Sequence, residues 1–461
     1  MPTTKLARLV CLVLLSPLIR CAKARTGGKP LLVTSVVSAL AIVVAACGHL
    51  ALTSAIAPVP SRWLFTFEIM GGRFRTPVEL VENSAGRLRA NALGPPLVTF
   101  KTVSIVGERL TLEGSSRFGG VRVSGRIASD SFDGRWRIKL LSGSVTATRL
   151  RIPVASPAER LATFDALHDT LVRRYYDAAF GGVNWDSLTH VYRVSAVGAR
   201  NDGEWLAIVR RMLSRLHSSH LDVAAITLAD ALPTRGGGAS TDESQFIKWR
   251  RIDAQVGYLR IAQFDEGPAA LDRLDSAFAA LVGLPGLVVD VRGNPGGTLG
   301  VAMRLGDYLL PPRTPVGTFT TQTPSVVVDY SGYKVDEFLQ LLRTRGAVRI
   351  MSGGRAARPY RGRVALLIDG HSGSTTEAFA GVLGELHLAT LVGERTAGAM
   401  LSAAEVALPL GWVLRFPEAD FRTPGGQRLE GHGVLPDVVV KRHWYRDNQL
   451  DRAVSIARQP R

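Results

Sequence analysis

The fold is decided by the stretch GLVVDVRGNPGG, residues 286–297. Its first half is a short apolar run whose length and β-branched content are typical of a buried strand. The run ends in a turn that contains Gly296 and Gly297, where backbone N–H groups can point at a ligand because no Cβ atom blocks the approach. We therefore predict a buried strand followed by a loop suited to hold a developing negative charge.

Strand and helix patterns alternate on both sides of this stretch. Apolar runs typical of strands occur at 256–264 and 363–370. Helical patterns lie between and after them, at residues 270–284, 300–310 and 375–388. Strands interleaved with helices predict an α/β domain in which helices pack on a sheet. We assign residues 253–461 to this domain.

Three other segments precede the α/β domain. Residues 58–152 alternate apolar and polar positions between Gly or Asp-Gly turns, which predicts a small antiparallel β-domain, either a barrel or a sandwich. Residues 153–232 change to a helical period, starting with a capping box of Ser156 and Glu159, and predict a helical segment. Residues 233–252, rich in Gly, Ser and Thr at their start, are predicted to be a linker.

The N-terminal segment, residues 1–57, has the pattern of an export signal or membrane anchor. A basic stretch precedes an apolar run, and no Lys, Arg, Asp or Glu occurs from Pro30 to Ser61. The end of the run, VVAACG, resembles the lipobox of bacterial lipoproteins, which implies lipid modification of Cys47. The run is also long enough for an uncleaved anchor. We expect the rest of the chain to lie outside the cytoplasm, in a bacterial cell envelope or periplasm, held at the membrane by this segment.

Composition excludes several classes of function. The net charge of +17 comes from 56 basic and 39 acidic residues. No clustered basic face is evident, so we do not expect a nucleic-acid partner. All three cysteines, Cys11, Cys21 and Cys47, precede the globular part, which therefore offers no thiolate metal site. A His-Glu-any-any-His motif is absent as well, and we expect neither a metal nor another cofactor.

The stretch GHSGSTTEAFAGVLGE, residues 370–385, contains two serines, Ser372 and Ser374, near the start of a predicted helix. A serine hydroxyl needs a neighbouring base to become a nucleophile near neutral pH. The position of Ser374 just before the helix lets the N–H of Thr375 and the helix N-terminus stabilise negative charge. A helix-capping role is the alternative, because Ser374 and Glu377 also fit a capping box.

Taken together, five segments resemble the C-terminal processing (tail-specific) serine peptidases, whose relatives include the tricorn core protease and the interphotoreceptor retinoid-binding protein. The resemblance covers about residues 158–440 in family order and spacing. It is carried by FDALHDTLVRRYYDAAFGGVNWDSL, MLSRLHSSHLDV, GLVVDVRGNPGG, HSGSTTEAFAGVLGELHLATLVGERTAG and LEGHGVLPDVVV. It implies a crotonase/ClpP-like ββα fold for the α/β domain and a serine peptidase activity that needs no cofactor.

In this family the nucleophile stands three residues before a glutamate, which implies Ser374 as the nucleophile and Ser372 as a turn residue. The tail-specific branch activates its serine with a lysine 25 residues downstream, but that position here is Ala399. A serine-lysine dyad is therefore not expected. The resemblance also implies an oxyanion hole built from backbone N–H groups near Gly296, Gly297 and Thr375.

The tricorn-like branch uses a histidine preceded by a serine, together with a distant glutamate. SSHLDV supplies Ser219 and His220, and LEGHGVLPD supplies Glu430. The resemblance implies His220 as the general base, with Ser219 and Glu430 polarising or orienting it. Histidine suits this task because its ordinary pKa of about 6.5 lets it accept a proton near neutrality.

Other histidines compete for the role of base. His217 lies three residues before His220, while His371 and His432 flank the expected serine and glutamate. Tail-specific members usually carry a PDZ domain before the catalytic sheet, but only about thirty residues follow His220 before the first strand pattern, too few for one. We therefore do not expect tail recognition by a PDZ domain. Residues 312–360 are expected to shape a substrate cleft.

The sequence therefore predicts an exported serine peptidase that acts on peptide or protein substrates. Two alternatives stay open. One is a non-catalytic module that binds apolar ligands, because a retinoid-binding relative shares the fold. The other is an esterase-like hydrolase, which the same site would support.

Overall fold

The computed structural model describes residues 59–69, 72–95, 98–116, 119–151, 155–226, 246–264, 267–356 and 359–460. Residues 1–57, with the expected export or anchor segment and Cys47, lie outside the described residues. Within the described ranges, none of the helices has the length and apolar character needed to span a membrane.

The N-terminal domain is one antiparallel sheet of eight strands in the order β3-β2-β1-β8-β7-β6-β5-β4. The pairing of β1 with both β2 and β8 turns the sheet back on itself, and β3 and β4 are in contact, so the barrel is nearly closed. The strands are β1 (Ser61–Ile69), β2 (Gly72–Glu82), β3 (Leu88–Ala92), β4 (Val98–Val106), β5 (Arg109–Ser116), β6 (Gly119–Ile127), β7 (Ser131–Ile138) and β8 (Leu141–Leu150). Trp63, Phe65 and Val145 are fully buried, as period-two alternation around one core requires. The predicted antiparallel β-domain is confirmed.

A helical segment follows the barrel. The expected capping box is present, because the Glu159 N–H donates to Ser156 Oγ at 3.2 Å and the Ser156 N–H donates to Glu159 Oε2 at 2.8 Å. Its elements are α3 (Pro157–Arg174), η1 (Phe180–Gly182), α4 (Trp185–Val197), α5 (Asp202–Leu213) and η2 (Ser214–Leu216). Buried Phe164 and Trp205 pack in one core with Phe416 from far along the chain. The helical segment is therefore held by the later part of the chain as well as by its own contacts.

A side chain of the barrel caps one helix of this segment. Glu79 on β2 accepts hydrogen bonds from the N–H groups of Asp202 and Gly203 at 2.9 and 2.8 Å, at the start of α5. A carboxylate at a helix N-terminus satisfies free N–H donors and interacts favourably with the helix dipole. Burial nevertheless raises the pKa of Glu79, an effect that these hydrogen bonds oppose. Arg62 on β1 also pairs with the Asp202 side chain.

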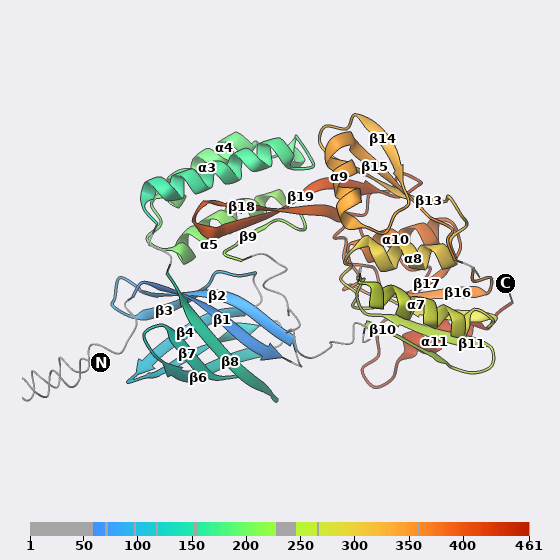
Figure 1. Ribbon diagram of the computed structural model, residues 1–461, viewed down its shortest axis with the longest axis horizontal. Coiled ribbons are helices and arrows are strands. Elements are labelled where there is room, and N and C mark those ends of the chain that lie inside the picture. Colours follow the sequence, from blue (N-terminus) through green and yellow to red (C-terminus); the bar gives the residue numbers. More distant parts are fainter. Residues whose placement is uncertain are drawn as a thin grey trace, which may run out of the picture. The chain divides into compact units, whose positions relative to one another are not determined.

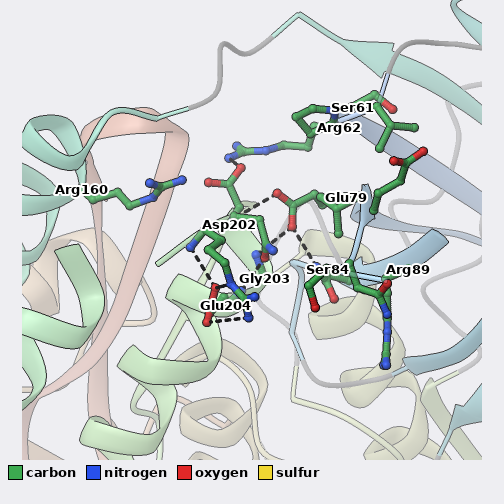
Figure 2. A pocket seen from close by; sticks show the side chains of 17 residues that line it. Ser61, Arg62, Glu79, Ser84, Arg89, Arg160, Asp202, Gly203 and Glu204 are labelled. Carbon is green, nitrogen blue, oxygen red and sulfur yellow. Dashed lines mark hydrogen bonds and ion pairs between the residues drawn. The ribbon is translucent and has the colours of Figure 1, made fainter. Parts of the chain in front are cut away.

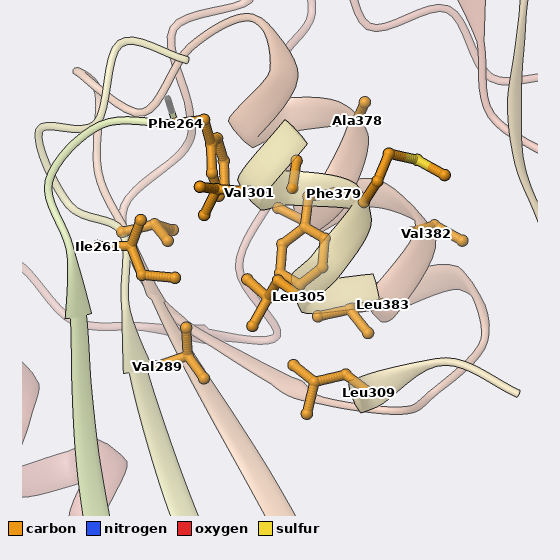
Figure 3. Packing of buried hydrophobic residues seen from close by; sticks show 14 of the residues in the cluster. Ile261, Phe264, Val289, Val301, Leu305, Leu309, Ala378, Phe379, Val382 and Leu383 are labelled. Carbon is orange, nitrogen blue, oxygen red and sulfur yellow. The ribbon is translucent and has the colours of Figure 1, made fainter. Parts of the chain in front are cut away.

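The α/β domain contains a sheet in the order β10-β11-β12-β16-β17-β20, parallel from β11 onward. Its strands are β10 (Ile247–Arg251), β11 (Val256–Ile261), β12 (Gly286–Asp290), β16 (Arg363–Ile368), β17 (Thr390–Gly393) and β20 (Val438–Val439). The helices are α7 (Pro268–Leu281), α8 (Leu299–Leu309), α10 (Thr375–Glu385) and α11 (Asn448–Ala457). Val289 faces a core shared with α7, α8 and α10, and its neighbour Val288 faces α11 (Figure 1, Figure 3). Helices thus cover both faces of the sheet, as the alternating patterns predict.

Two features differ from the sequence-based expectations. Residues 247–251, inside the range predicted as linker, form β10, which pairs antiparallel with β11. The polar composition IKWRR hides this strand, although Ile247 is fully buried. A second sheet was not predicted at all; its order is β14-β15-β13-β19-β18, and β9 also pairs with β19.

The second sheet joins segments that are distant in the sequence (Figure 1). Its elements are β9 (Asp222–Ala224), β13 (Pro315–Thr320), β14 (Val326–Tyr330), α9 (Val335–Arg345), β15 (Gly346–Met351), β18 (Leu401–Leu408), η4 (Pro409–Gly411) and β19 (Trp412–Arg422). β19 pairs with β9 at one end and with β13 at the other. The loop before β9, which carries His220, is therefore anchored to the α/β domain through β19.

Candidate active site

Ser374 lies in the turn between β16 and α10, immediately before the helix. Its N–H donates to Ala399 O and to Glu377 Oε2, both at 3.1 Å, so the glutamate of the possible capping box does return to the serine. The backbone of Ser374 differs from an ordinary N-cap, however. Its φ is +55°, whereas the N-cap Ser156 has φ −72° in the usual extended region. A non-glycine residue held in this region is strained, and such strain is concentrated at functional sites.

The loop after β12 packs directly against this serine. A Cβ atom at Gly296 would lie 2.6 Å from Ser374 Cβ and 3.0 Å from Thr375 N, so only glycine fits there. The Gly296 N–H donates to Asn294 Oδ1 at 2.9 Å and is not available to a ligand. Thr375 Oγ1 donates to Gly297 O at 2.8 Å, while the N–H groups of Gly297 and Thr375 have no partner among the described residues. These two N–H groups are the remaining candidate donors to an oxyanion.

Ser219, His220 and Glu430 form one hydrogen-bonded network. Ser219 donates to Glu430 twice, from N to Oε1 at 2.8 Å and from Oγ to Oε2 at 2.9 Å. His220 Nδ1 lies 2.7 Å from Ser219 Oγ. Because the single hydroxyl proton of Ser219 goes to Glu430, the ring donates from Nδ1, which leaves a lone pair on Nε2. This tautomer is the one that a general base requires.

Glu430 also ties this network to the segment beside Ser374. The carboxylate is buried and accepts a hydrogen bond from Met400 N to Oε2 at 2.8 Å. The preceding residue, Ala399, accepts the hydrogen bond from Ser374 N. The described residues contain no direct hydrogen bond between the side chains of Ser374 and His220. His220 lines a pocket together with Asp222 and Arg415, and Ser374 is not among the residues of that pocket.

The environment of His220 keeps the imidazole neutral. Burial, with a further contribution from the positive charge of Arg415, lowers the pKa of His220 to about 4. Arg415 lies on β19, paired in the sheet with Asp222 on β9. Burial also lowers the pKa of the Arg415 guanidinium. At neutral pH His220 is therefore unprotonated and able to accept a proton.

Ala399 occupies the position where a lysine activates the serine in the tail-specific branch. Its backbone contacts Glu377 on α10 and Ser374 just before the helix, because the Ala399 N–H donates to Glu377 Oε2 at 2.7 Å and its carbonyl accepts from Ser374 N. The structure thus places this position beside the serine, but with a methyl group that cannot remove a proton.

The other candidate histidines, His217, His371 and His432, do not take part in the network of Ser219, His220 and Glu430. His217 is exposed and ends η2. The His371 N–H donates to Asp369 Oδ1 at 3.0 Å, and the residue lines a different pocket, together with Arg292. His432 Nδ1 lies 2.9 Å from the Glu430 carbonyl rather than its carboxylate. The described residues contain no cluster of His, Cys, Asp and Glu side chains that would hold a metal ion.

An apolar pocket opens beside the proposed oxyanion donor Thr375. Its volume is about 30 Å³, and Val316, Phe319, Ile350 and Ser352 contribute to its wall. The apolar lining includes Leu299, Met303, Val316, Phe319, Ile350, Phe379, Met400 and Phe421. Sequence reasoning did not single out Asn294, Met400 or Arg415. Their positions follow from the folding of the loops that carry Asn294 and Met400 and of the strand that carries Arg415.

The strained serine at a helix N-terminus and the network of serine, histidine and glutamate contain the residue types that nucleophilic serine catalysis needs. Residues 255–440 match the model of Peptidase family S41. The carboxy-terminal-processing protease of Bartonella bacilliformis is 29% identical over 198 residues, which are 41% of this chain and 40% of the relative. The carboxyl-terminal-processing protease of Synechocystis is 29% identical over 196 residues, 41% of this chain and 39% of the relative.

Two solved structures show similar but more distant chains. The photosystem II D1 C-terminal processing protease has a TM-score of 0.47 and 17% identity over 66% of this chain and 98% of its own. The tricorn protease has a TM-score of 0.46 and 12% identity over 88% of this chain and 59% of its own. This chain spans about two fifths of the length of the two curated relatives.

Proposed function

We propose that this protein is a serine peptidase that hydrolyses peptide bonds through an acyl-enzyme on Ser374. The observation that carries the proposal is the network of Glu430, Ser219 and His220, which fixes the imidazole tautomer and connects through Met400 and Ala399 to the strained serine. A serine used only as a helix cap would need neither the strain nor the network.

In the proposed mechanism, Ser374 Oγ attacks the substrate carbonyl while His220 Nε2 takes its proton. The Gly297 and Thr375 N–H groups donate to the oxygen as it becomes negative. His220 then gives the proton to the leaving amine, and water attacks the acyl-enzyme by the same steps in reverse order. Ser219 and Glu430 stabilise the transient positive charge of the ring.

The apolar pocket beside Thr375 suggests which substrates fit. A cavity of about 30 Å³ has room for a small apolar side chain but not for an extended apolar ligand. We therefore propose substrates with a small apolar residue at the cleaved bond. The same restriction disfavours a module whose role is to carry a large apolar molecule at this place.

The N-terminal pattern supports the further proposal that the peptidase works outside the cytoplasm, attached through the apolar segment or a lipid on Cys47. Mass spectrometry of the purified N-terminus is the measurement. A mature chain that begins at a lipid-modified Cys47 is expected, and an intact bond between residues 46 and 47 without lipid would contradict lipidation.

Labelling of the full chain with a fluorophosphonate probe tests the proposed nucleophile. The Ser374→Ala variant is expected to lose all labelling and His220→Ala to lose most of it. His217→Ala is the matched histidine control and should label normally, because His217 is exposed and outside the network. Labelling that survives Ser374→Ala would identify a different serine.

Parallel assays with peptide and ester substrates separate the remaining alternatives. Hydrolysis of peptides that is lost in Ser374→Ala supports the peptidase, and hydrolysis of esters alone supports an esterase-like hydrolase. Folded wild-type protein that neither labels nor hydrolyses either substrate contradicts the proposal.

A further inference from the structure

A polar cavity of about 770 Å³ lies where the barrel meets the helical segment (Figure 2). Its wall is formed by β1, β2 and β3 of the barrel together with the starts of α3 and α5. The cavity has the size of a site for a drug-sized molecule or a short peptide. It does not include Ser374, His220 or Glu430, so the proposed mechanism gives it no role.

Two buried arginines point into this cavity. Arg62 on β1 and Arg160 on α3 are each 5% exposed. Figure 2 shows their guanidinium groups directed toward Asp202 from two different elements. Arg62 Nη1 and Arg160 Nε and Nη2 are buried atoms that have no hydrogen-bond partner among the described residues. Buried charged donors of this kind are costly unless an acceptor is supplied.

The nearby carboxylates already have other partners. Asp202 pairs with Arg62 Nη2, and Glu79 accepts from Asn91 Nδ2 and from two N–H groups of α5. Glu204 is bound by Arg200 on the exposed side, with Nε to Oε2 at 3.1 Å. None of these interactions reaches the buried donors of Arg160. A ligand oxygen is therefore the acceptor that the cavity lacks.

The charges of the lining favour a monoanion. The cavity is lined by four arginines and four carboxylates, so a phosphate dianion would meet strong repulsion that a single carboxylate largely avoids. A guanidinium pair also matches the two oxygens of a carboxylate. Amide and hydroxyl side chains complete the lining, at Asn83, Ser84, Asn91 and Asn201. Such groups match the donors and acceptors of a peptide backbone.

We propose that this cavity is a binding site for the C-terminal carboxylate of a peptide, held by Arg62 and Arg160. The site is separate from the peptidase centre and does not depend on the chemistry proposed for Ser374. It gives the barrel a role in recognition, for which the sequence offers no motif.

Binding is measured by calorimetry on the full chain carrying Ser374→Ala, so that the probe is not cleaved. The probes are acetyl-trialanine with a free carboxylate, its C-terminal amide and inorganic phosphate. The free acid is expected to bind, and Arg160→Gln is expected to weaken it at least about tenfold, which is about 1.4 kcal/mol. Arg173→Gln, an exposed arginine on the same helix, is the matched control and should bind like the parent.

Every other result overturns the proposal. Equal affinity for acid and amide, or no change in Arg160→Gln, would place the peptide elsewhere, such as in the Ser374 cleft. Tighter binding of phosphate would contradict the carboxylate assignment. No binding of the free acid up to about 10 mM would mean that the arginines are structural only.

The stability of an Arg160→Met variant provides an independent test that does not need a ligand. Removal of a buried guanidinium, two of whose nitrogen atoms have no hydrogen-bond partner among the described residues, is expected to raise the unliganded Tm by a few degrees. A lower Tm in Arg160→Met would show that Arg160 supports the fold and would contradict the proposal.

Discussion

Glu377 and Glu430 are both buried carboxylates, and both accept hydrogen bonds from the same segment, residues 396–400. Glu377 accepts from Thr396 Oγ1 at 2.6 Å and from Gly398 N and Ala399 N at 2.7 Å, in addition to Ser374 N. Glu430 accepts from Met400 N and, through Ser219, reaches the ring of His220. The two glutamates are therefore similarly buried but contact different kinds of hydrogen-bond donors.

The difference lies in the donors. Apart from one threonine hydroxyl, every donor to Glu377 is a backbone N–H, so this carboxylate fixes the conformation of the loops around Ser374. Glu430 accepts a hydrogen bond from the Ser219 hydroxyl, which is also hydrogen-bonded to the imidazole of His220. Glu430 therefore acts on a side chain that can change its protonation state. Burial alone does not distinguish the two carboxylates, whereas the hydrogen-bonded path to an imidazole is present only for Glu430 among the described contacts.

The largest expected effect is the loss of activity in Glu430→Gln. The neutral amide no longer stabilises the imidazolium, and kcat should fall by about 10²–10⁴, as when the acidic member of a triad is made neutral. Steady-state kinetics on folded protein provide the measurement. Activity within a few-fold of wild type would remove Glu430 from the proposed relay.

Glu377→Gln should instead act on stability. Four donors converge on this carboxylate, and the amide nitrogen would face at least one of them, which should lower the free energy of unfolding by about 3 kcal/mol. Denaturant titration measures the change, and the kcat of the remaining folded molecules should stay within about tenfold of wild type. A stable but inactive Glu377→Gln protein would reverse the assigned roles of the two glutamates.

The pH dependence of kcat/KM tests the surroundings of the base. With a pKa of about 4, His220 is about 90% neutral at pH 5, whereas with the ordinary value of about 6.5 it would be about 3% neutral. The kcat/KM at pH 5 should therefore be about thirtyfold higher than it would be if His220 had the ordinary pKa. The Arg415→Met variant should move the acid limb upward, because one cause of the depressed pKa is removed, while Arg422→Met on the same strand should not. An acid limb near pH 6.5 in wild type would contradict the role assigned to burial.

The same depressed pKa of His220 affects folding with a definite sign. The unfolded chain binds a proton at this histidine below about pH 6.5, while the folded chain does so only near pH 4. The free energy of unfolding should therefore decrease as the pH falls through this interval.

The smallest of these effects is expected for Ser219→Ala. This change removes the hydroxyl between Glu430 and His220 but leaves both charges in place and enough room for a bridging water, so kcat should fall only about tenfold. A loss as large as that of Glu430→Gln would show that the hydroxyl cannot be replaced. No loss at all would show that the imidazole is oriented by other contacts.

Local sequence patterns were sufficient to predict the strands and helices whose buried residues recur at the period of the element itself. The alternation in β1 predicts a strand, and the apolar run before Asp290 predicts the buried β12, because side-chain burial repeats with the element itself. Barrel closure was beyond this reasoning, since it depends on the pairing of β1 with β8, whose partners Arg62 and Leu150 are far apart in the sequence. The second sheet was not predicted for the same reason, because its strands come from distant parts of the sequence.

In the candidate active site, too, the sequence indicated some residues, whereas the contacts of others appear only in the structure. The motif positions of Ser374 and His220 could be selected from the sequence, but only the folded loops show that the Gly296 N–H is taken by Asn294 and that Arg415 influences His220. The buried arginines of the cavity gave no signal, because Arg62 and Arg160 each lie in an ordinary strand or helix pattern. The burial of these two arginines is seen only in the folded structure, where β1 and α3 line the same cavity.

The hydrogen bonds from Ser219 to Glu430 span 211 positions of the chain. During synthesis, therefore, the histidine loop leaves the ribosome long before the carboxylate that orients it, and the serine follows between them. If the proposed chemistry holds, a nascent chain cannot cleave its neighbours until the last of these segments has emerged and folded. On this proposal, the order of these residues along the chain would itself delay the onset of activity.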